Sequence, residues 1–593
     1  MSDYLVIWGD LGQAPAQAVL DRLEAEVVGH GGWRWAMRAP DFALLTPIAR
    51  PPRLHHLADS RGLIIGDLWA TGRDEAPDLD GLLSRSAGAS TAARALCAGA
   101  WGRYVAILTD TEAPAIFRDS SGGLEALTWR CGALTMIASR LTPEILDAVG
   151  PPLALDWGRI AGYLASPSSV SGPLALRGVN AIEPGELVAL GGQTRTPIWA
   201  PAMFVGAPVE PATLAQSRLV RHVDRALRCM TRDRGPVLAE VSGGLDSAIV
   251  ASALARLEEV EVVQWLNYYG AGAESDERVF AKSIGDLYGL EITCVAKPSR
   301  PIDLEGLAAN AGGVRPSLMG LDYLRDQDVA QRCVQLGAKA IVTGQGGDAV
   351  FLQRLTPLAL ADQMRREGRL ALRAGAVRAL ADWTGSSAWS VLRQALGGTA
   401  KARPARAPSG PAFLTREARA VEVPPHPWLC DLDGVAPGKR QQIERLVQSQ
   451  LVTGDCQRAR DADLLHPLLA QPLVEYSLGL PTDVLTQLQR DRALARQAFS
   501  RRLPDAVVQR RSKGDMTGHY GRWVAASLPF LRSFLLEGRL AAQGIIDRER
   551  LEALLTAEQL AWGADYVSIL FAAVLEAWAQ RWEARIRSQV APR

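Results

Sequence analysis

The stretch EVSGGLDSAIVASAL, residues 240–254, decides how the middle of this chain folds. The apolar run PVLAEV that leads into it is typical of a buried strand, and SAIVASALARL has the apolar spacing of a helix. A strand, a glycine-rich turn and a helix form an anion-binding arrangement, because the backbone N–H groups of the turn face inward and the helix N-terminus carries a partial positive charge. We therefore expect a ligand that carries phosphate at this turn.

The spacing inside the turn distinguishes between kinds of phosphate loop. No lysine follows Gly244, so the Walker pattern is missing, and so is the dinucleotide fingerprint G-x-G-x-x-G. The pattern present is S-G-G-x-D-S, formed by Ser242, Gly243, Gly244, Leu245, Asp246 and Ser247. It resembles the pyrophosphate loop of ATP pyrophosphatases, which cleave ATP between the α and β phosphates and transfer AMP. For these six residues alone, an ordinary turn with a capping Asp or Ser stays open as the alternative.

Composition excludes several classes of function. The net charge of +1 gives no electrostatic reason to expect nucleic acid or an anionic membrane as a partner. No apolar run approaches ~18 residues and the N-terminus lacks a basic signal region, so we expect a cytoplasmic protein. The seven cysteines are scattered without C-x-x-C, and the seven histidines show no H-E-x-x-H, so neither a disulfide framework nor a zinc site is indicated.

The texture of the sequence changes along the chain and predicts two domains. Residues 1–205 read as short strands between Gly, Asp and Pro breaks, with a helix near DWGRIAGYLA. Residues 206–593 begin with helices that alternate with the apolar strands PVLAEV, EVVQWLNY, EITCVA and KAIVTG, as in a parallel sheet. After about residue 355 the chain is mostly helical, with a mobile loop expected at about 397–414. The predicted fold class is α/β and multidomain.

A second glycine-rich turn follows the strand KAIVTG. It places Gly344, Gln345, Gly346, Gly347 and Asp348 at the carboxyl edge of the sheet, where open α/β sheets bind ligands. Asp246 and Asp348 would then face one polyphosphate. Two carboxylates in that position need a cation, and Mg²⁺ is bound by one or two carboxylates together with phosphate oxygens.

Positive charge gathers further along, between residues 492 and 513. A solvated helix face is the simpler interpretation for Arg501 and Arg502. The segment RRSKG is different, because a lysine before a glycine on a loop can reach a site and offset phosphate charge in a transition state.

The ordered set of motifs resembles the asparagine synthetase family over nearly the whole chain. Residues 213–585 match its synthetase domain through SGGLDS, ESDERVFAKSIGDLYGL, G-x-G-x-D, P-L-x-x-x-x-L-V-E and L-P-x(n)-R-x-K-G. The N-terminal part resembles its class II glutamine amidotransferase domain, an Ntn-hydrolase-like β-rich sandwich, through WGRYVAILTD, FRDSSGG, IASR and LRGVNAIEPGELVAL. The synthetase part resembles a doubly wound ATP-pyrophosphatase domain.

The resemblance implies ATP and Mg²⁺ and gives roles to the residues named above. Asp246 and Asp348 would hold the metal, and Lys513 and Arg492 would stabilise the charge that develops during catalysis. The residues expected to bind ATP and pyrophosphate are Ser242, Gly243, Gly244, Leu245, Asp246, Ser247, Gly344, Gln345, Gly346, Gly347 and Arg511.

Two departures from the family narrow the expected substrate. The amidotransferase domain of the family uses a cysteine directly after the initiator Met, whereas this chain has Ser2 there and its first cysteine is Cys97. We therefore expect no glutaminase and no internal source of ammonia. At Gln345 asparagine synthetases carry Glu and β-lactam synthetases carry Tyr, and a glutamine cannot act as a general base.

A synthetase without a glutaminase takes its amine from the acceptor, as lasso-peptide macrolactam cyclases do. HPWL at 426–429, PGKRQQIERL, HPLLAQPLVE and RRSKGDMTGHY resemble that group. The resemblance implies adenylation of an Asp or Glu side chain of a leader-free precursor peptide and ring closure by its N-terminal amine. A leader-binding protein and a leader peptidase are the expected partners. A β-lactam-synthetase-like enzyme, an ammonia-dependent asparagine synthetase and a non-enzymatic peptide-binding protein stay open as alternatives.

Overall fold

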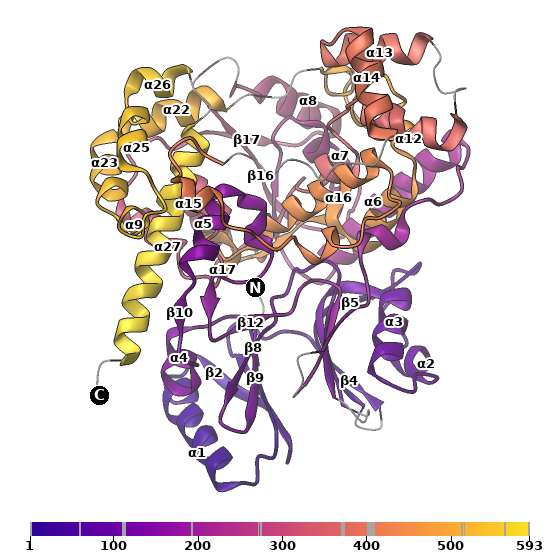
Figure 1. The fold of residues 1–593 in the computed structure, drawn as a ribbon. Coiled ribbons are helices and arrows are strands. Elements are labelled where there is room, and N and C mark those ends of the chain that lie inside the picture. The colour runs from indigo at the N-terminus through magenta and orange to yellow at the C-terminus, as the bar shows by residue number, and fades with distance from the viewer. Residues whose placement is uncertain are drawn as a thin grey trace.

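The computed structural model divides into a β-rich N-terminal part and a larger α/β and helical part (Figure 1). It describes residues 3–58, 61–109, 114–190, 194–270, 272, 275–368, 374–399, 410–511, 514, 516–562 and 565–590. The predicted boundary between residues 205 and 206 falls after the short helix η4 (Pro201–Phe204) and before α6 (Ala212–Thr231). Among the described residues, no helix has the length and apolar character needed to cross a bilayer.

The described residues of the N-terminal part form two antiparallel sheets of six strands each. In spatial order, the first sheet contains β12 (Asn180–Ala181), β8 (Leu127–Cys131), β9 (Leu134–Ala138), β1 (Leu5–Trp8), β3 (Phe42–Pro47) and β2 (Trp33–Arg38). The second contains β14 (Arg195–Pro197), β13 (Glu186–Ala189), β7 (Ala115–Arg118), β6 (Ala100–Leu108), β5 (Gly62–Ala70) and β4 (Leu54–Leu57). A short pair, β10 (Ala154–Leu155) with β11 (Leu176–Arg177), lies apart.

The side-chain alternation of the strands explains why these sheets stack. In β6, Val105 and Ile107 lie between the two sheets with Tyr4 and Val6, whereas Tyr104 faces the other way and packs beside α3. Helices α1 (Ala14–Leu23) and α4 (Pro143–Val149) pack over the outer face of the first sheet, and α2 (Leu79–Leu83) and α3 (Ala89–Gly99) over that of the second. The result is a helix–sheet–sheet–helix sandwich.

The sequence predicted fewer helices here than the structure has. The helix expected near DWGRIAGYLA is present as α5 (Trp157–Ala165), begun by the Asp156 side chain, which accepts from the Arg159 amide. Helices α1 and α3 were not predicted, because both are rich in Ala and polar residues and their apolar periodicity is weak. Packing against the sheets, where Leu20 and Leu96 are buried, stabilises them.

Between residues 237 and 465 the described residues form a parallel sheet of five strands. Its spatial order is β17 (Ile292–Ala296), β16 (Val262–Tyr269), β15 (Val237–Glu240), β18 (Ala340–Val342) and β19 (Asp463–Leu465). The first four are the strands predicted from sequence, and the parallel sheet is confirmed. Strand β19 has three residues and was missed, because so short an apolar run resembles the start of a helix. The chain order reverses between β15 and β18, which is where doubly wound sheets bind ligands.

Helices cover both faces of this sheet. Val237 and Ala239 pack with α6, α7 (Leu245–Leu254) and α8 (Arg278–Tyr288), and Leu238 packs on the opposite face with α10 (Tyr323–Leu336) and α17 (Gln457–Asp461). The remaining short helices in and beside the α/β part are α9 (Leu304–Ala309), η6 (Leu318–Asp322), α11 (Gly347–Val350), η10 (Pro467–Leu469), α19 (Thr482–Thr486), α20 (Ala493–Ala498) and α21 (Asp505–Gln509).

The C-terminal third is helical, as predicted. Its longest helix, α27 (Tyr566–Val590), runs from the α/β part toward the N-terminal sandwich (Figure 1). The other helices of this region are α12 (Leu358–Glu367), α13 (Ala374–Thr384), α14 (Ala388–Thr399), α15 (Arg416–Arg419), α16 (Pro437–Ser449), α18 (Gln471–Gly479), α22 (Thr517–Ala526), α23 (Leu528–Leu536), α24 (Arg539–Ala542), α25 (Arg548–Leu554) and α26 (Ala557–Trp562).

The mobile loop predicted at 397–414 includes, at both ends, residues that belong to a helix or to the core. Residues 397–399 belong to α14, while Phe413 and Leu414 are fully buried and Leu414 forms a bridge with Ile546. The apolar side chains at the end of the stretch anchor it to the core. Residues 400–409 lie outside the described residues.

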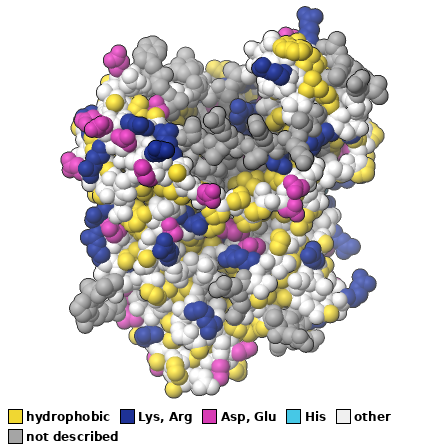
Figure 2. Space-filling model, in the orientation of Figure 1, with side chains coloured by type: hydrophobic (Ala, Val, Ile, Leu, Met, Phe, Trp, Pro, Cys, Tyr) yellow, Lys and Arg dark blue, Asp and Glu magenta, His cyan; other side chains and the backbone are white. Residues whose placement is uncertain are grey.

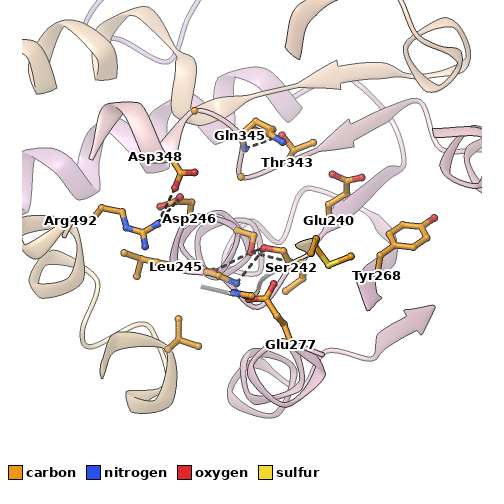
Figure 3. A pocket seen from close by; sticks show the side chains of 18 of the residues that line it. Glu240, Ser242, Leu245, Asp246, Tyr268, Glu277, Thr343, Gln345, Asp348 and Arg492 are labelled. Carbon is orange, nitrogen blue, oxygen red and sulfur yellow. Dashed lines mark hydrogen bonds and ion pairs between the residues drawn. The ribbon is translucent and has the colours of Figure 1, made fainter. Parts of the chain in front are cut away.

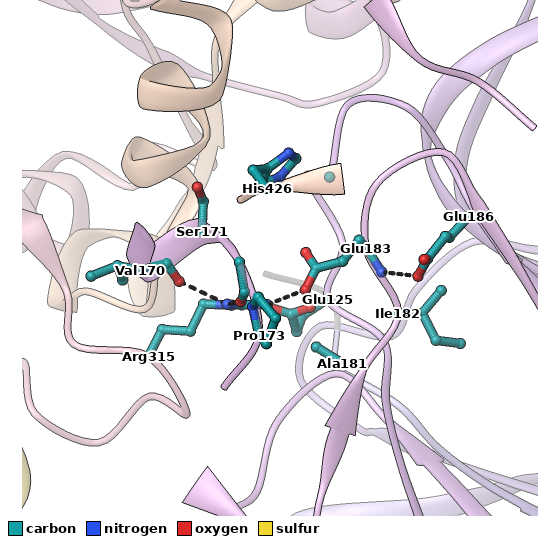
Figure 4. Close-up of polar contacts among 12 residues, drawn as sticks. Glu125, Val170, Ser171, Pro173, Ala181, Ile182, Glu183, Glu186, Arg315 and His426 are labelled. Atoms are coloured by element: carbon teal, nitrogen blue, oxygen red, sulfur yellow. Dashed lines mark hydrogen bonds and ion pairs between the residues drawn. The ribbon is translucent and has the colours of Figure 1, made fainter. Parts of the chain in front are cut away.

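Two groups of buried charges join the N-terminal sandwich to the rest. In the first, Arg315 donates to the carbonyl oxygens of Val170 (2.7 Å) and Gly172 and pairs with Glu183 (3.2 Å) and Glu125 (3.6 Å) (Figure 4). Burial alone would lower the pKa of Arg315, but the two carboxylates outweigh it and raise the pKa. Arg315 therefore stays charged while it holds two segments of the N-terminal part.

The second group lies where β19 meets the sandwich. Asp463 accepts from Arg50 at 2.6 Å and pairs with Arg103 at 3.7 Å and with Arg234. Arg103 also bonds Asp67 of β5. Burial would raise the pKa of Asp463, but these guanidinium groups lower it well below its usual range.

On the face shown in Figure 2, the described residues of the outer surface form no large area of a single charge. Figure 2 shows Lys and Arg side chains interspersed with Asp and Glu among the described residues of that face, in keeping with the net charge of +1.

Replacing Arg315 tests the first group. Arg315→Met removes the cation paired with buried Glu183, while Glu125 keeps Arg118 at 2.6 Å. We expect it to destabilise the fold by about 3 to 5 kcal/mol, which calorimetry would record as a lower unfolding temperature. The matched control is Arg177→Met, since the Arg177 side chain is 67% exposed and its ion pair with Asp156, at 3.1 Å, lies at the surface. Equal unfolding temperatures for the two variants would contradict this role for Arg315.

Lys439 makes stability depend on pH. It is buried on α16, its Nζ donates to Gln442 (2.7 Å) and to the carbonyl of Ser477 (3.0 Å), and burial lowers its pKa to about 7. Between that value and its ordinary pKa near 10.5, the unfolded chain holds a proton that the folded chain lacks. Stability from this group therefore rises with pH across that window, by up to about 1.4 kcal/mol per pH unit.

Lys439→Met removes that contribution. We expect the variant to be more stable than the parent near pH 7 and the difference to shrink toward pH 9, as measured by denaturant unfolding. A difference that does not change with pH would contradict a neutral Lys439 in the folded state.

Candidate active site

A cavity of about 450 Å³ lies at the carboxyl edge of the parallel sheet, over the ends of β15 and β18 (Figure 3). It is therefore at the point where the strand order reverses. The residues predicted from sequence that line it are Ser242, Gly244, Leu245, Asp246, Ser247, Gly344, Gln345, Gly346, Asp348 and Arg492.

The first loop is held by its own serines. The amide of Ser242 donates to the hydroxyl of Ser247 (3.1 Å), and the amide of Gly244 donates to the hydroxyl of Ser242 (3.3 Å). Gly243 does not line the cavity but has φ = 82°, and a Cβ there would lie 2.7 Å from the carbonyl oxygen of Glu277. Only glycine permits both this left-handed backbone conformation and this close approach to Glu277. The N-terminus of α7 faces the cavity and favours an anion there.

The second loop packs directly onto the first. A Cβ on Gly344 would lie 2.5 Å from the amide nitrogen of Ser247, and a Cβ on Gly347 would collide with the carboxyl group of Asp246. Gly347 does not line the cavity, but its lack of a side chain sets the distance between the loops. The amide of Gln345 donates to Thr343 (3.2 Å), whose hydroxyl is 2.7 Å from Nδ1 of His466.

Arg492 joins the two loops through their carboxylates. Its Nη1 lies 3.0 Å from Asp246 and 3.2 Å from Asp348, and Nη2 lies 2.7 Å from Asp491 (Figure 3). Burial would lower the pKa of Arg492, but these carboxylates raise it. Its backbone has φ = 50°, a left-handed conformation that costs a non-glycine residue of the order of 1–3 kcal/mol and is concentrated at functional sites.

The pair of aspartates fits a divalent cation. Asp246 and Asp348 converge on one positive charge, here the guanidinium of Arg492, and carboxylate oxygens are the ligands that Mg²⁺ prefers. No group of three or more metal-ligating side chains occurs among the described residues. The remaining ligands of the cation would therefore be phosphate oxygens rather than side chains.

The segment RRSKG contributes a different arginine from the one expected. Arg511 is exposed and does not line the cavity. Arg510 does: it donates to the carbonyl of Gly243 (3.2 Å), pairs with Glu277 (2.6 Å) and stacks on the ring of Phe280. The two arginines are adjacent, and sequence alone does not say which of them faces inward.

Lys513, expected to act in catalysis, lies outside the described residues. Its neighbour Gly514 lines the cavity and donates its amide to Glu277 at 3.0 Å. Glu277 therefore fixes the chain on both sides of Lys513, through Arg510 and through Gly514.

Sequence reasoning missed four further residues of the cavity lining, namely the charged Glu240, Lys297 and Arg325 and the neutral Tyr268. Glu240 pairs with Arg325 and Arg458, both at 2.8 Å, and these two cations lower its pKa although burial raises it. Lys297 pairs with Asp322 at 2.7 Å, and burial lowers its pKa. Glu240, Tyr268 and Lys297 lie at the carboxyl ends of β15, β16 and β17, and that shared position was the signal that could have found them.

Cys97, the first cysteine of the chain, is not poised for catalysis in the N-terminal sandwich. Cys97 is partly buried on α3, and burial raises the pKa of its thiol. Its backbone carbonyl accepts from Gln471 at 2.9 Å. Ser2 lies outside the described residues.

A doubly wound sheet with two glycine-rich loops and paired aspartates at its switch point defines a nucleotide-using enzyme of the α/β class. The family model for asparagine synthase matches residues 218–580, so the chain belongs to the asparagine synthase family. The match covers the cavity and every loop that lines it, and it places the chain among enzymes that use ATP to form amide bonds.

Solved structures give weaker likenesses. The allosteric regulatory enzyme of purine biosynthesis is 12% identical with a TM-score of 0.21, over 57% of this chain and 89% of its own. The glutamine phosphoribosylpyrophosphate amidotransferase from B. subtilis, in complex with ADP and GMP, is 12% identical with a TM-score of 0.20, over 57% of this chain and 90% of its own.

A third likeness is to the U34-tRNA thiolase NcsA from Methanococcus maripaludis, with its [4Fe-4S] cluster, which is 14% identical with a TM-score of 0.19, over 40% of this chain and 80% of its own. Scores this low add nothing to the fold described above. A comparison with curated proteins gives no match.

Arg492 and Arg511 offer a matched pair of substitutions. Arg492→Met removes a buried positive charge between Asp246 and Asp348, and we expect about 10²- to 10³-fold slower ATP-dependent AMP formation. Arg492→Lys should restore part of the rate, because the charge returns. Arg511→Met should be nearly neutral, since that side chain is exposed. A larger loss for Arg511→Met than for Arg492→Met would contradict the assignment.

Proposed function

We propose that this chain is a lasso-peptide cyclase, which closes a macrolactam ring in a leader-free precursor peptide at the expense of ATP. The observation that carries the proposal is the single cavity that brings Asp246, Asp348 and Arg492 onto the two glycine-rich loops. The first cysteine of the chain, Cys97, has a thiol whose pKa is raised by burial, in keeping with an amine that comes from the acceptor rather than from glutamine.

In the first step, ATP lies over the loop at 242–247 as substrate. A side-chain carboxylate of an Asp or Glu in the peptide attacks the α-phosphorus, the bond to the β-phosphate oxygen breaks, and pyrophosphate leaves. Asp246 and Asp348 would hold Mg²⁺, which offsets the charge of the pyrophosphate. Arg492, and Lys513 between the two contacts of Glu277, stabilise the negative charge that develops.

In the second step, the N-terminal amine of the peptide attacks the acyl carbon, the bond between that carbon and the phosphate oxygen of AMP breaks, and the amine loses a proton to solvent as the amide forms. Gln345 lies on the cavity wall and cannot accept the proton of the amine. An N-terminal amine has a reference pKa of about 7.7 to 8.0, so an appreciable fraction is neutral near pH 7 to 8 without a base. Both reacting groups are on one peptide, so folding of the peptide in the site supplies the proximity.

The N-terminal sandwich, residues 1–205, is on this proposal a class II amidotransferase-like domain that has lost its glutaminase. The buried charges of Arg315 and Asp463 give it a structural role instead. A leader-binding protein and a leader peptidase would deliver the peptide in the cytoplasm.

The test uses a synthetic peptide with a free N-terminal amine and one acidic side chain, incubated with ATP and Mg²⁺. We expect AMP and pyrophosphate, and a product lighter than the peptide by one water, with the new bond between residue 1 and the acidic side chain. Acetylating the N-terminus should stop the reaction after adenylate formation, and hydroxylamine should then trap the acyl group.

Other products would refute the proposal. ADP and phosphate as main products would remove the adenylation step. Free asparagine made from aspartate and ammonia, or a ring closed within a small amino acid derivative, would assign the chain to another branch of the family.

A further inference from the structure

The cavity of the candidate active site is not isolated, because a second cavity shares its wall. This second cavity, of about 330 Å³, is lined by Arg325 and Met516, which also line the first. A third hollow, of about 930 Å³, adjoins the second at Val567, which lines both. The three cavities are therefore neighbours, the first and second at Arg325 and Met516 and the second and third at Val567.

The second cavity is apolar and aromatic on one side. Leu318, Leu321 and Leu570 line it together with Tyr520 and Tyr566, whose rings are parallel with centroids 6.3 Å apart. The hydroxyl of Tyr520 donates to Asp322 at 2.8 Å and accepts from Lys297 at the same distance. The rings are therefore held in place by polar contacts at their edges.

The charged side chains that line the second cavity, Asp322, Arg325, Asp326 and Arg458, all take part in ion pairs. Asp322 pairs with Lys297, Arg325 with Glu240, and Asp326 with Arg458 at 3.2 Å. A wall of paired charges beside aromatic and leucine side chains favours an uncharged, apolar group over a free ion.

The third hollow is formed by both halves of the molecule. Leu164 and Pro167 come from the N-terminal part, Pro411 from the segment after α14, and Val567 and Phe571 from α27. A ligand that lies here touches segments that are far apart in sequence.

The volumes of the second and third cavities argue against a small molecule as the acceptor substrate. Each of these spaces is as large as a pocket that holds a whole ligand, which is about 300–1,000 Å³. A nucleotide takes the first cavity, and an amino acid or ammonia would leave the other two without an occupant.

We propose that the second and third cavities bind the acceptor peptide beside its activated carboxylate, with an apolar or aromatic side chain against Tyr520, Tyr566 and Leu570 and the continuing chain along Val567 toward the surface. The proposal rests on the proposed function and adds the substrate class of the site, a peptide with an apolar residue near the acidic one. It also assigns α27 to substrate binding.

The test separates peptide binding from ring closure. The probe is a synthetic peptide with a free N-terminal amine, one glutamate and a benzoylphenylalanine near it, bound in the presence of a non-hydrolysable ATP analogue and cross-linked by light. We expect mass spectrometry to find the cross-links in residues 516–520 and 566–570, which line the second cavity. Cross-links confined to other segments overturn the proposal.

Val567→Trp narrows the junction between the two cavities, and Val567 is 46% exposed, so the substitution leaves the core intact. We expect it to weaken binding of the probe by about tenfold, while affinity for the ATP analogue stays unchanged. The matched control is Val334→Trp, on α10, where Val334 is 68% exposed and lines none of the three cavities.

The possible outcomes distinguish this inference from the proposed function. If the probe binds and cross-links as expected but no ring forms, the cavities bind peptide and the cyclase function fails. If Val567→Trp binds the probe as Val334→Trp does, the inference fails even where the ring still forms.

Discussion

The approach of two backbone loops, without side chains between them, determines everything else at this site. Gly344 lies against the amide of Ser247, and Gly347 against the carboxyl group of Asp246. Because nothing larger than hydrogen fits there, the carboxylates of Asp246 and Asp348 end within reach of one guanidinium. Arg492 then balances two negative charges that would otherwise repel each other, and its left-handed backbone shows that the surrounding structure imposes this position.

The sequence was sufficient for the parallel sheet and for the two glycine-rich loops at its carboxyl edge, because glycine patterns and apolar strands are local signals. Ten of the residues named from sequence line one cavity. It was insufficient where the answer depends on which way a side chain faces. Arg510 and Arg511 are adjacent in sequence, and only packing against Phe280 and Glu277 selects Arg510. The short strand β19 and the alanine-rich helices α1 and α3 likewise depend on tertiary contacts.

The N-terminal sandwich keeps a close connection to the synthetase part although burial raises the pKa of its Cys97 thiol and so makes that thiol a poor nucleophile. At one contact, Arg315 of the α/β part pairs with Glu125 and Glu183 of the sandwich. At the other contact, Asp463 pairs with Arg50, Arg103 and Arg234. Buried ion pairs are costly to form and costly to break one-sidedly, so they favour a single relative arrangement of the two parts. A fixed arrangement matters for the third cavity, whose lining comes from both.

Helix α27 has 25 residues and so extends over about 37 Å. Tyr566 and Val567 at its beginning line the inner cavities, and near its end Arg585 pairs with Asp147 of α4 at 2.6 Å. Helix α27 thus contacts both the second cavity, beside the candidate active site, and α4 on the outer face of the sandwich. The cavity wall formed by Tyr566 and Val567 and the outer helix layer of the sandwich therefore share one stiff element, so a substitution that loosens α27 against α4 would also loosen the wall of the second cavity.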